Sequence, residues 1–305
     1  MFLPLCDDVQ KRHPPVVTIG LIVLNVLPYL YTMRLWRDDM MAYDYEFTTW
    51  FAFITRWGLV PKELAQGNVI GLFTSMFLHG DFMHILGNMI ALWAFAWTLE
   101  NLLGSGRFAV LYFVCGLVGG VGQCIGDLDS EIPCIGASGA VAGLMGAYCL
   151  TFGVATRMKT LIWIFRPIVV YVPTCVFAVI WLGMQGLGVL ASAPGEPGVA
   201  WWAHLGGFLA GMAMMPLLNT GERRLGRDKD GSLTIAQFAK PGETINSETA
   251  DALEEAEPQP ELCDYCGTEV TDATAMAPGL FRCPNPACGR LHLAKARRPA
   301  TPVRS

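Results

Sequence analysis

The sequence predicts an all-α membrane domain of six spanning helices, followed by a water-soluble tail. Hydrophobic residues make up 53% of the 305-residue chain and charged residues only 15%, whereas a soluble domain carries about 25% charged residues. Residues 14–219 carry little charge for their length, and residues 220–305 hold more than half of it. This shift indicates a membrane domain that ends near residue 219 and a polar segment after it.

Six stretches approach the roughly 20 apolar residues that a spanning helix needs. The predicted spans are residues 15–33, 82–103, 107–126, 138–155, 168–190 and 200–219. The fourth is short and rich in Gly and Ala, so we expect it to lie among the other helices rather than face lipid. A cleavable signal peptide is not expected, because acidic residues precede a first apolar run that ends in Pro28.

Basic residues predict the orientation of these spans. Lys and Arg occur before the first stretch, between the second and third, between the fourth and fifth, and after the sixth, whereas the short loops on the other side have none. By the positive-inside rule, both termini are expected in the cytoplasm. The long segment 34–81 is an exception, because it holds four basic residues among interfacial aromatic ones.

The expected surroundings are a lipid bilayer, namely a bacterial inner membrane, since no organelle signal is evident. The net charge of −5 disfavours nucleic acid as a partner. We therefore expect a multi-pass integral membrane protein.

Ser138 is the first candidate site residue, because polar residues inside spans are costly and each one suggests a function. It lies in Gly136-Ala137-Ser138-Gly139-Ala140, at the expected start of the fourth helix. Free backbone N–H groups and a partial positive charge at a helix start favour a developing oxyanion. An ordinary N-cap serine would occupy the same position, so this segment alone leaves both interpretations open.

His204 is the second candidate, near the start of the sixth helix. Small residues recur every four positions beside both candidates: Ala203, Gly207 and Gly211 beside His204, and Ala142 and Gly146 after Ser138. Two such faces allow helix backbones to approach closely in a membrane, as a Ser–His hydrogen bond between helices requires. A packing histidine bonded to a neighbouring carbonyl is the alternative.

His84 and Asn88 lie four residues apart, on one face of the second helix. Both side chains can donate hydrogen bonds to an oxyanion beside the backbone N–H of Ser138. Polar contacts between helices are the other common role for Asn and His in membranes.

Together these segments resemble the rhomboid family of intramembrane serine proteases. Residues 77–89 are similar to its second-helix motif with a His-x-x-x-Asn core, and residues 136–139 to its Gly-x-Ser-x nucleophile motif. Residues 203–211 are similar to its Ala-His-x-x-Gly-x-x-x-Gly motif, and residues 100–108 to its cytoplasmic turn between helices two and three. The four motifs occur in the family's order over roughly residues 70–215.

The resemblance implies a six-helix rhomboid bundle that uses a Ser–His dyad without a third acid or a catalytic cofactor. Ser138 would be the nucleophile and His204 the base, with His84, Asn88 and the Ser138 N–H as oxyanion donors. The implied substrates are single-span membrane proteins, cleaved near the outer membrane boundary.

Two departures from the family pattern are visible. The Trp-Arg pair that many members carry before the second-helix motif is missing from residues 68–71. Ala142 stands where some members have an aromatic residue, so the packing partner of the histidine must come from elsewhere.

The sequence disfavours two other protein classes. A proteolytically inactive rhomboid relative that binds membrane proteins usually lacks the Ser or the His, and both are present here. A channel or transporter would predict mid-membrane charges or inverted repeats, and the sequence shows neither.

The tail divides into a polar linker at residues 220–262, a module at 263–295 and a short end at 296–305. Cys263, Cys266, Cys283 and Cys288 have the spacing of a zinc ribbon, in which four thiolates bind a structural Zn²⁺. Two disulfides are the alternative, which a cytoplasmic location disfavours. Cys124 and Cys134 face outward in this topology, and the sequence leaves open whether they form a disulfide.

Overall fold

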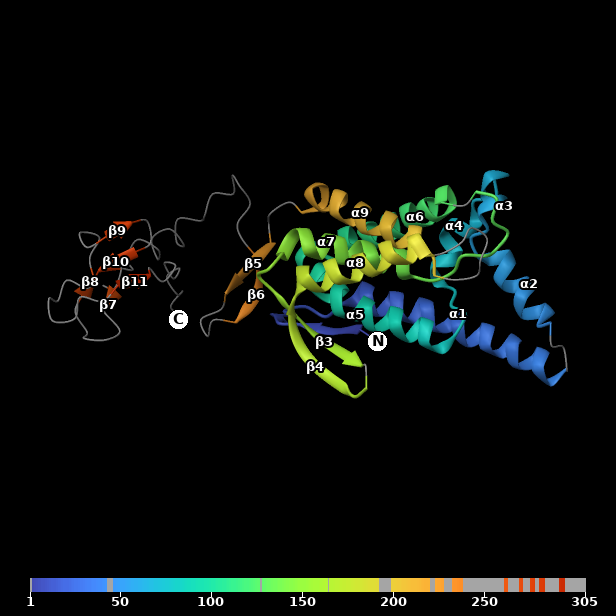
Figure 1. Ribbon diagram of the computed structural model, residues 1–305, viewed down its shortest axis with the longest axis horizontal. Helices are drawn as coiled ribbons and strands as arrows, with labels where there is room; N and C mark the ends of the chain where they lie inside the picture. The colour runs from blue at the N-terminus through green and yellow to red at the C-terminus, as the bar shows by residue number, and fades with distance from the viewer. Residues whose placement is uncertain are drawn as a thin grey trace, which may run out of the picture. The chain divides into compact units, whose positions relative to one another are not determined.

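The computed structural model describes residues 2–42, 46–126, 128–163, 165–191, 199–219, 223–227 and 232–237, together with five short strands between residues 261 and 293. The chain forms two compact units, Met1–Phe238 and Ala239–Ser305. Figure 1 shows the described helices gathered in the first unit. Each unit is described by itself below.

The helices of the first unit follow one another along the chain with a short helical segment η1 among them. They are α1 (Val16–Met41), α2 (Thr48–Trp57), α3 (Pro61–Ala65), α4 (Ile70–Thr74), η1 (Ser75–Phe77), α5 (Phe82–Leu103), α6 (Ser105–Gly126), α7 (Ser138–Phe152), α8 (Thr174–Ala191) and α9 (Trp201–Leu218). Its strands are β1 (Phe2–Asp7), β2 (Val9–Gln10), β3 (Arg157–Trp163), β4 (Pro167–Pro173), β5 (Arg223–Arg227) and β6 (Leu233–Gln237).

A helix occurs at each of the six predicted spans, namely α1, α5, α6, α7, α8 and α9. By length and composition, α1, α5 and α6 can each cross a membrane, and α7 and residues 174–188 of α8 form shorter apolar helices. The core lies between these helices, where the largest fully buried side chains are aromatic: Phe95, Phe108, Tyr112, Tyr148 and Phe177.

The first helix is longer than predicted, because it continues past residue 33 into a charged segment. Arg34 lies one turn before Asp38, and their side chains form an ion pair at 3.5 Å. Such pairs stabilise a helix beyond its apolar part. The apolar pattern alone therefore placed the helix end eight residues too early.

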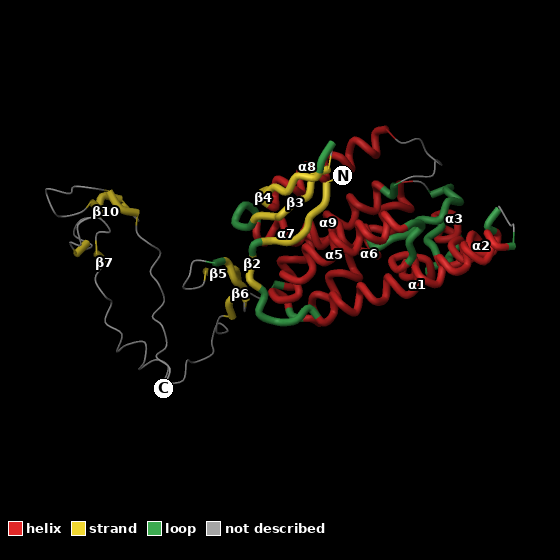
Figure 2. The backbone as a smooth tube through the Cα atoms, turned by 90° about the horizontal axis from the view of Figure 1, so that it is seen from below, coloured by secondary structure: helices red, strands yellow, loops and turns green. Residues whose placement is uncertain are grey.

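The prediction of an all-α domain is wrong in part, since β3 and β4 form an antiparallel hairpin within the predicted fourth loop and the start of the fifth span. The hairpin pairs Arg157 with Pro173 and Trp163 with Pro167, and β1 adds to its other edge, giving the order β1-β3-β4. Figure 2 shows these strands beside the helices. The β-branched sequence of β4 favours a strand, so α8 starts only at Thr174.

A second small sheet, in the order β2-β6-β5, includes part of the predicted linker. Here β5 pairs antiparallel with β6, and β6 pairs parallel with β2 near the N-terminus. Leu233, Thr234 and Ile235 of β6 are buried. The first unit consequently extends to Phe238, rather than ending at residue 219, because these apolar side chains find partners far away in the sequence.

Buried acids fasten the N-terminal segment to the end of the bundle at which α5 and α7 end, which we call the strand end. Asp7 is 8% exposed. Its carboxylate accepts hydrogen bonds from Tyr148 Oη (2.6 Å) and Thr98 Oγ1 and forms an ion pair with Lys11. One carboxylate therefore joins β1 to two helices.

Glu100 makes a second junction at the strand end. Its carboxylate accepts from the backbone N–H groups of Val17 and Thr18 (both 2.9 Å), and from the hydroxyls of Thr18 and Ser105 (both 2.7 Å). The first N–H groups of a helix have no partner within it, and a negative charge there is favourable. Glu100 thereby fixes the start of α1 against the turn between α5 and α6.

The second unit contains β7 (Glu261–Leu262), β8 (Glu269–Val270), β9 (Ala275–Ala277), β10 (Leu280–Arg282) and β11 (Leu291–Leu293). An antiparallel pairing joins β7 to β8, and others join β10 to β9 and to β11. The four cysteines predicted to bind zinc lie outside the described residues.

Candidate active site

The backbones of α7 and α9 are in direct contact along a row of glycines. A Cβ atom added to Gly207 would lie 2.0 Å from the carbonyl oxygen of Gly139, and one added to Gly211 would lie 1.8 Å from that of Gly143. Real Cβ atoms do not come so close, so only glycine fits. The close approach predicted for these helices is confirmed. On α7 it includes Gly146 of the predicted row, where a Cβ would lie 2.2 Å from the Phe208 carbonyl oxygen, and also Gly139 and Gly143 beside that row.

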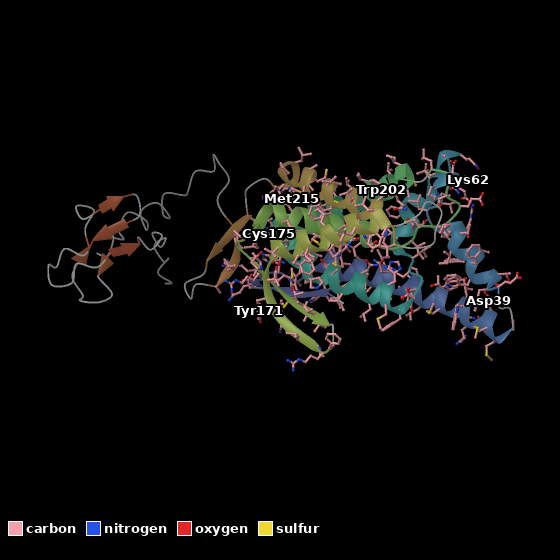
Figure 3. The ribbon with its side chains drawn as sticks, in the orientation of Figure 1. Asp39, Lys62, Tyr171, Cys175, Trp202 and Met215 are labelled. Carbon is pink, nitrogen blue, oxygen red and sulfur yellow. The ribbon has the colours of Figure 1, made fainter. Side chains whose placement is uncertain are left out.

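This contact brings the starts of the two helices together. Gly139 follows Ser138, and a Cβ there would lie 3.4 Å from the carbonyl oxygen of Ala203, which precedes His204. We call this end of the first unit the site end. Figure 3 shows Trp202, at the start of α9, lying toward the same end as Lys62 of α3, with Met215 toward the other.

Ser138 is the first residue of α7, and it is half-buried. The turn before it depends on Gly136, whose φ of +124° is rarely adopted by residues with a side chain. The Gly136 N–H donates to the carbonyl of Ser75 (2.9 Å). The turn therefore presents the serine at a helix start, with its backbone position fixed from η1.

His84 and Asn88 lie against this same turn. A Cβ on Gly136 would be 2.6 Å from His84 Nε2 and 3.7 Å from Asn88 Nδ2. Asp81 accepts a hydrogen bond from the His84 N–H (2.9 Å) and caps α5, which sets where the helix begins. Thus two side-chain nitrogens from α5 approach the backbone two residues before Ser138.

The segment between α1 and α5 supports the turn from the other side. Leu59 and Cys134 exchange backbone hydrogen bonds of 2.9 and 2.8 Å, and the Lys62 N–H donates to the carbonyl of Ser130 (3.1 Å). Gly71 packs against Gly58, since a Cβ on Gly71 would lie 2.3 Å from the Gly58 oxygen. Close glycine contacts and backbone hydrogen bonds therefore fix the segment between α1 and α5 in place, although it lacks the Trp-Arg pair of many family members.

His79 lies in the loop before α5 and is fully buried. Its ring centroid is 5.0 Å from that of His84, in an edge-to-face arrangement. Burial, together with the neighbouring His84, lowers the pKa of His79 to about 3. The residue is therefore neutral at physiological pH.

His204 is 7% exposed, and residues of α8 and α9 surround its ring. His204 Nδ1 lies 2.6 Å from Gln185 Oε1. The ring of Trp181 lies 5.4 Å from the imidazole, and that of Trp201 lies 6.2 Å away and perpendicular to it. The packing partners expected from elsewhere are therefore two tryptophans and a glutamine.

Sequence reasoning missed Gln185 and Trp181. The rule that a polar residue inside a span suggests a function applies to Gln185 as well as to the four residues chosen. It is 6% exposed on an otherwise apolar stretch of α8, which is the signal that could have identified it.

Within the described part of the chain, no hydrogen bond joins Ser138 to His204. The structure brings their backbone neighbours into contact and leaves both side chains at the same site end. Catalytic hydrogen bonds are often longer in the absence of substrate than in the reacting complex.

The described cysteines, which include Cys124 and Cys134, are all free thiols. The described residues contain no group of three or more His, Cys, Asp or Glu that could hold a metal ion.

Comparison with known proteins identifies the family. The rhomboid domain model matches residues 66–220, just over half of the chain. Three relatives with rhomboid names are similar to parts of it. YdcA of Bacillus subtilis is 31% identical over 142 residues, which are 45% of this chain and 62% of the relative.

The second relative, RHOMBOID-like protein 5 of Arabidopsis thaliana, is 37% identical over 91 residues, 30% of this chain and 29% of the relative. Rhomboid protease GlpG of Yersinia enterocolitica is 31% identical over 162 residues, 53% of this chain and 52% of the relative.

The chain spans less than two thirds of the length of each of these relatives. The region matched by the domain model holds α5, α6, α7, α8 and α9, and therefore Ser138, His204, His84, Asn88 and Gln185. The apolar helices and this match together show that the chain is an integral membrane protein of the rhomboid family.

Proposed function

We propose that this protein is an intramembrane serine endopeptidase in which Ser138 is the nucleophile and His204 the general base. The observation that carries the proposal is the meeting of three helices at one turn. Gly139 of α7 contacts Ala203 of α9, and His84 and Asn88 of α5 lie against Gly136. The proposed nucleophile, base and oxyanion donors would thus come from separate elements to the start of α7.

The reaction would begin when His204 takes the proton of the Ser138 hydroxyl, because serine is a weak nucleophile until a base activates it. The alkoxide attacks the scissile carbonyl, and the resulting oxyanion accepts hydrogen bonds from the Ser138 N–H, His84 and Asn88. His204 then protonates the leaving amine. Water hydrolyses the acyl-enzyme by the same steps, which regenerates Ser138.

The proposed substrates are single-span membrane proteins, cleaved near the outer boundary of the membrane. In this proposal α1, α5, α6, α7, α8 and α9 all span a bacterial inner membrane, and both termini are cytoplasmic. The site end would then face outward, where water can reach the half-buried Ser138. Most residues of the short helix α7 are buried among the other helices, so the backbone polar groups at its ends would face protein rather than lipid.

The direct test is cleavage of a model single-span substrate by the purified protein in detergent or liposomes. Cleavage is expected with the wild-type protein and not with Ser138→Ala or His204→Ala. A substrate that stays intact with the wild-type protein, across several sequences, would instead support a rhomboid relative that binds membrane proteins without cleaving them. Ser138 and His204, both described residues, share no hydrogen bond in the structure, and this observation favours the second function.

For the tail we propose a structural Zn²⁺ bound by Cys263, Cys266, Cys283 and Cys288. The first two cysteines lie in the sequence between β7 and β8, which pair, and the last two lie between β10 and β11, which also pair. Two hairpin connections carrying two thiolates each are typical of a four-Cys zinc site. Metal analysis of the full chain should give one zinc per protein, lost when Cys263 and Cys266 are both changed to Ser.

A further inference from the structure

The one polar side chain that contacts the His204 imidazole within hydrogen-bonding distance is Gln185 of α8, among the residues described. Its Oε1 lies 2.6 Å from His204 Nδ1. Both side chains are nearly fully buried, at 6% and 7% exposed. A buried polar contact of this kind has a defined donor and acceptor, because an unpaired group there would be costly.

The Gln185 amide has only one sensible orientation. Its Nε2 donates to the Trp181 carbonyl at 3.2 Å. Exchanging the amide oxygen and nitrogen would set two acceptor oxygens against each other at this distance, since a carbonyl can only accept. The amide oxygen must therefore face the imidazole.

This orientation fixes the proton on His204. An amide oxygen accepts hydrogen bonds and cannot donate, so Nδ1 must carry the proton in the neutral ring. The lone pair is then on Nε2, the nitrogen that is left to act as a base. A ring with its proton on Nε2 would place two acceptors 2.6 Å apart.

The tryptophans fix the plane of the ring. Trp181 lies one turn before Gln185 on α8, so the two side chains share one face of that helix. Its ring packs against the imidazole at 5.4 Å, and Trp201 closes the perpendicular side at 6.2 Å. The same face of α8 thus supplies both the hydrogen bond and the packing surface.

We propose that Gln185 is a positioning residue that sets the tautomer and the orientation of His204 for catalysis. The inference rests on the proposed function, since it gives His204 the role of base. Gln185 would do the orienting work that a carboxylate does in a Ser-His-Asp triad. A neutral amide achieves this in an apolar helix without the desolvation cost of a buried charge.

Three variants of the full-length protein separate this role from general packing. Gln185→Met keeps the length of the side chain and removes the oxygen acceptor. Gln185→Glu restores an oxygen acceptor at the same place. The matched control is Gln123→Met on α6, because Gln123 also bonds to the start of α9, through the Ala203 N–H at 3.3 Å, but has no recorded hydrogen bond to the imidazole.

The first measurement is the tautomer of His204, read from the ¹⁵N shifts of the protein labelled at histidine, with His204→Ala to assign the signal. We expect the Nδ1–H form in the wild type, in Gln185→Glu and in Gln123→Met. In Gln185→Met the two tautomers should mix. An Nε2–H wild type, or an unchanged tautomer in Gln185→Met, would overturn the proposal.

The second measurement is substrate cleavage. Groups that orient a metal-ligating histidine are typically worth roughly 10- to 100-fold in activity, and with a comparable loss for an oriented histidine base, Gln185→Met should lower kcat by about this factor with little change in KM. Gln185→Glu should recover part of the loss. Equal kcat in Gln185→Met and the wild type would contradict the proposed role.

The cleavage assay and the tautomer measurement can contradict the proposed function and the role of Gln185 separately. A wild-type protein that cleaves no substrate disproves the proposed function, while the tautomer still reports whether Gln185 positions the ring. If Gln185→Met does not fold, as judged by thermal melting, the wild-type tautomer and the Gln185→Glu spectrum decide the question. A Gln185→Glu protein with a switched tautomer and no cleavage would reject the acceptor role.

Discussion

The strand end and the site end of the first unit are each stabilised by a different kind of interaction. At the strand end, the buried carboxylates of Asp7 and Glu100 each accept several hydrogen bonds from other segments. At the site end, glycine backbones touch, and the polar contacts of His204 and Gly136 are with neutral groups. Charge-assisted bonds are the stronger ones, whereas backbone packing sets position. Stability and chemistry are therefore expected to depend on different residues.

After the changes at Ser138 and His204, Asn88→Ala should have the largest effect on cleavage and almost none on folding. Loss of one oxyanion donor typically lowers kcat by roughly 100- to 1,000-fold. The control is Asn25→Ala on α1, another buried asparagine, whose side chain bonds to the Leu21 carbonyl far from the site in sequence. Steady-state kinetics with thermal melting would test this, and equal kcat values for the two variants would remove Asn88 from the site.

Gly207→Ala should affect both cleavage and stability, because the glycine contact positions α9. The added Cβ would lie 2.0 Å from the Gly139 oxygen, so α9 must move away from α7. A displacement of about 1 Å at a catalytic group can cost roughly 100-fold in rate, and overpacking costs about 1–3 kcal/mol.

Gly87→Ala on α5 is the matched control for this change. A Cβ there has no neighbour within 4 Å, so cleavage and melting temperature should both stay at wild-type values. If Gly207→Ala behaved in the same way as Gly87→Ala, the close contact would not be needed for the site.

Glu100→Ala should reverse the pattern and lower stability while leaving the site intact. The change leaves the N–H groups of Val17 and Thr18 without their acceptor. Removing one partner of a buried charged hydrogen-bond group costs about 2–5 kcal/mol. We expect a lower melting temperature and an unchanged kcat/KM for the folded protein, and a fall in kcat/KM would show that the two ends are coupled.

The smallest effect should come from His79 and depends on pH. Its pKa is about 3 in the folded protein and 6.5 without burial, so the unfolded chain binds more protons between these values. The contribution of neutral, buried His79 to the free energy of unfolding is therefore fully present above pH 6.5. It falls as the pH falls, by about 2 kcal/mol at pH 5. Melting at pH 7.5 and 5 should show a steeper loss for the wild type than for His79→Leu. If the wild type and His79→Leu lost stability equally between pH 7.5 and pH 5, the lowered pKa of His79 would be contradicted.

The sequence predicted those parts of the structure that local patterns encode. Each of the six apolar stretches contains a helix, and Ser138 begins one of them. The small-residue face of α9 also could be predicted, because Gly207 and Gly211 repeat with helical spacing. These features depend on neighbouring residues, so a pattern along the chain contains the needed information.

The missed features are those that distant segments create together. Phe2 pairs with Ile162 in the first sheet, and Val9 pairs with Leu233 in the second. No local period indicates such partners, so residues 223–237 looked like a linker. The contact of Gln185 with His204 likewise depends on the rotation of α8, which the sequence of that helix does not specify.

The pairing of β1 and β2 has a consequence for how the protein is made. Residues 2–10 leave the ribosome well before their strand partners, which lie at residues 157–163 and 233–237. This segment must therefore wait until helices α1 to α7 have been synthesised before its first partner exists, and until α8 and α9 have followed before its second. A bulky fusion placed directly before Phe2 would delay this last step of assembly, whereas one placed after Ser305 would leave it free to proceed.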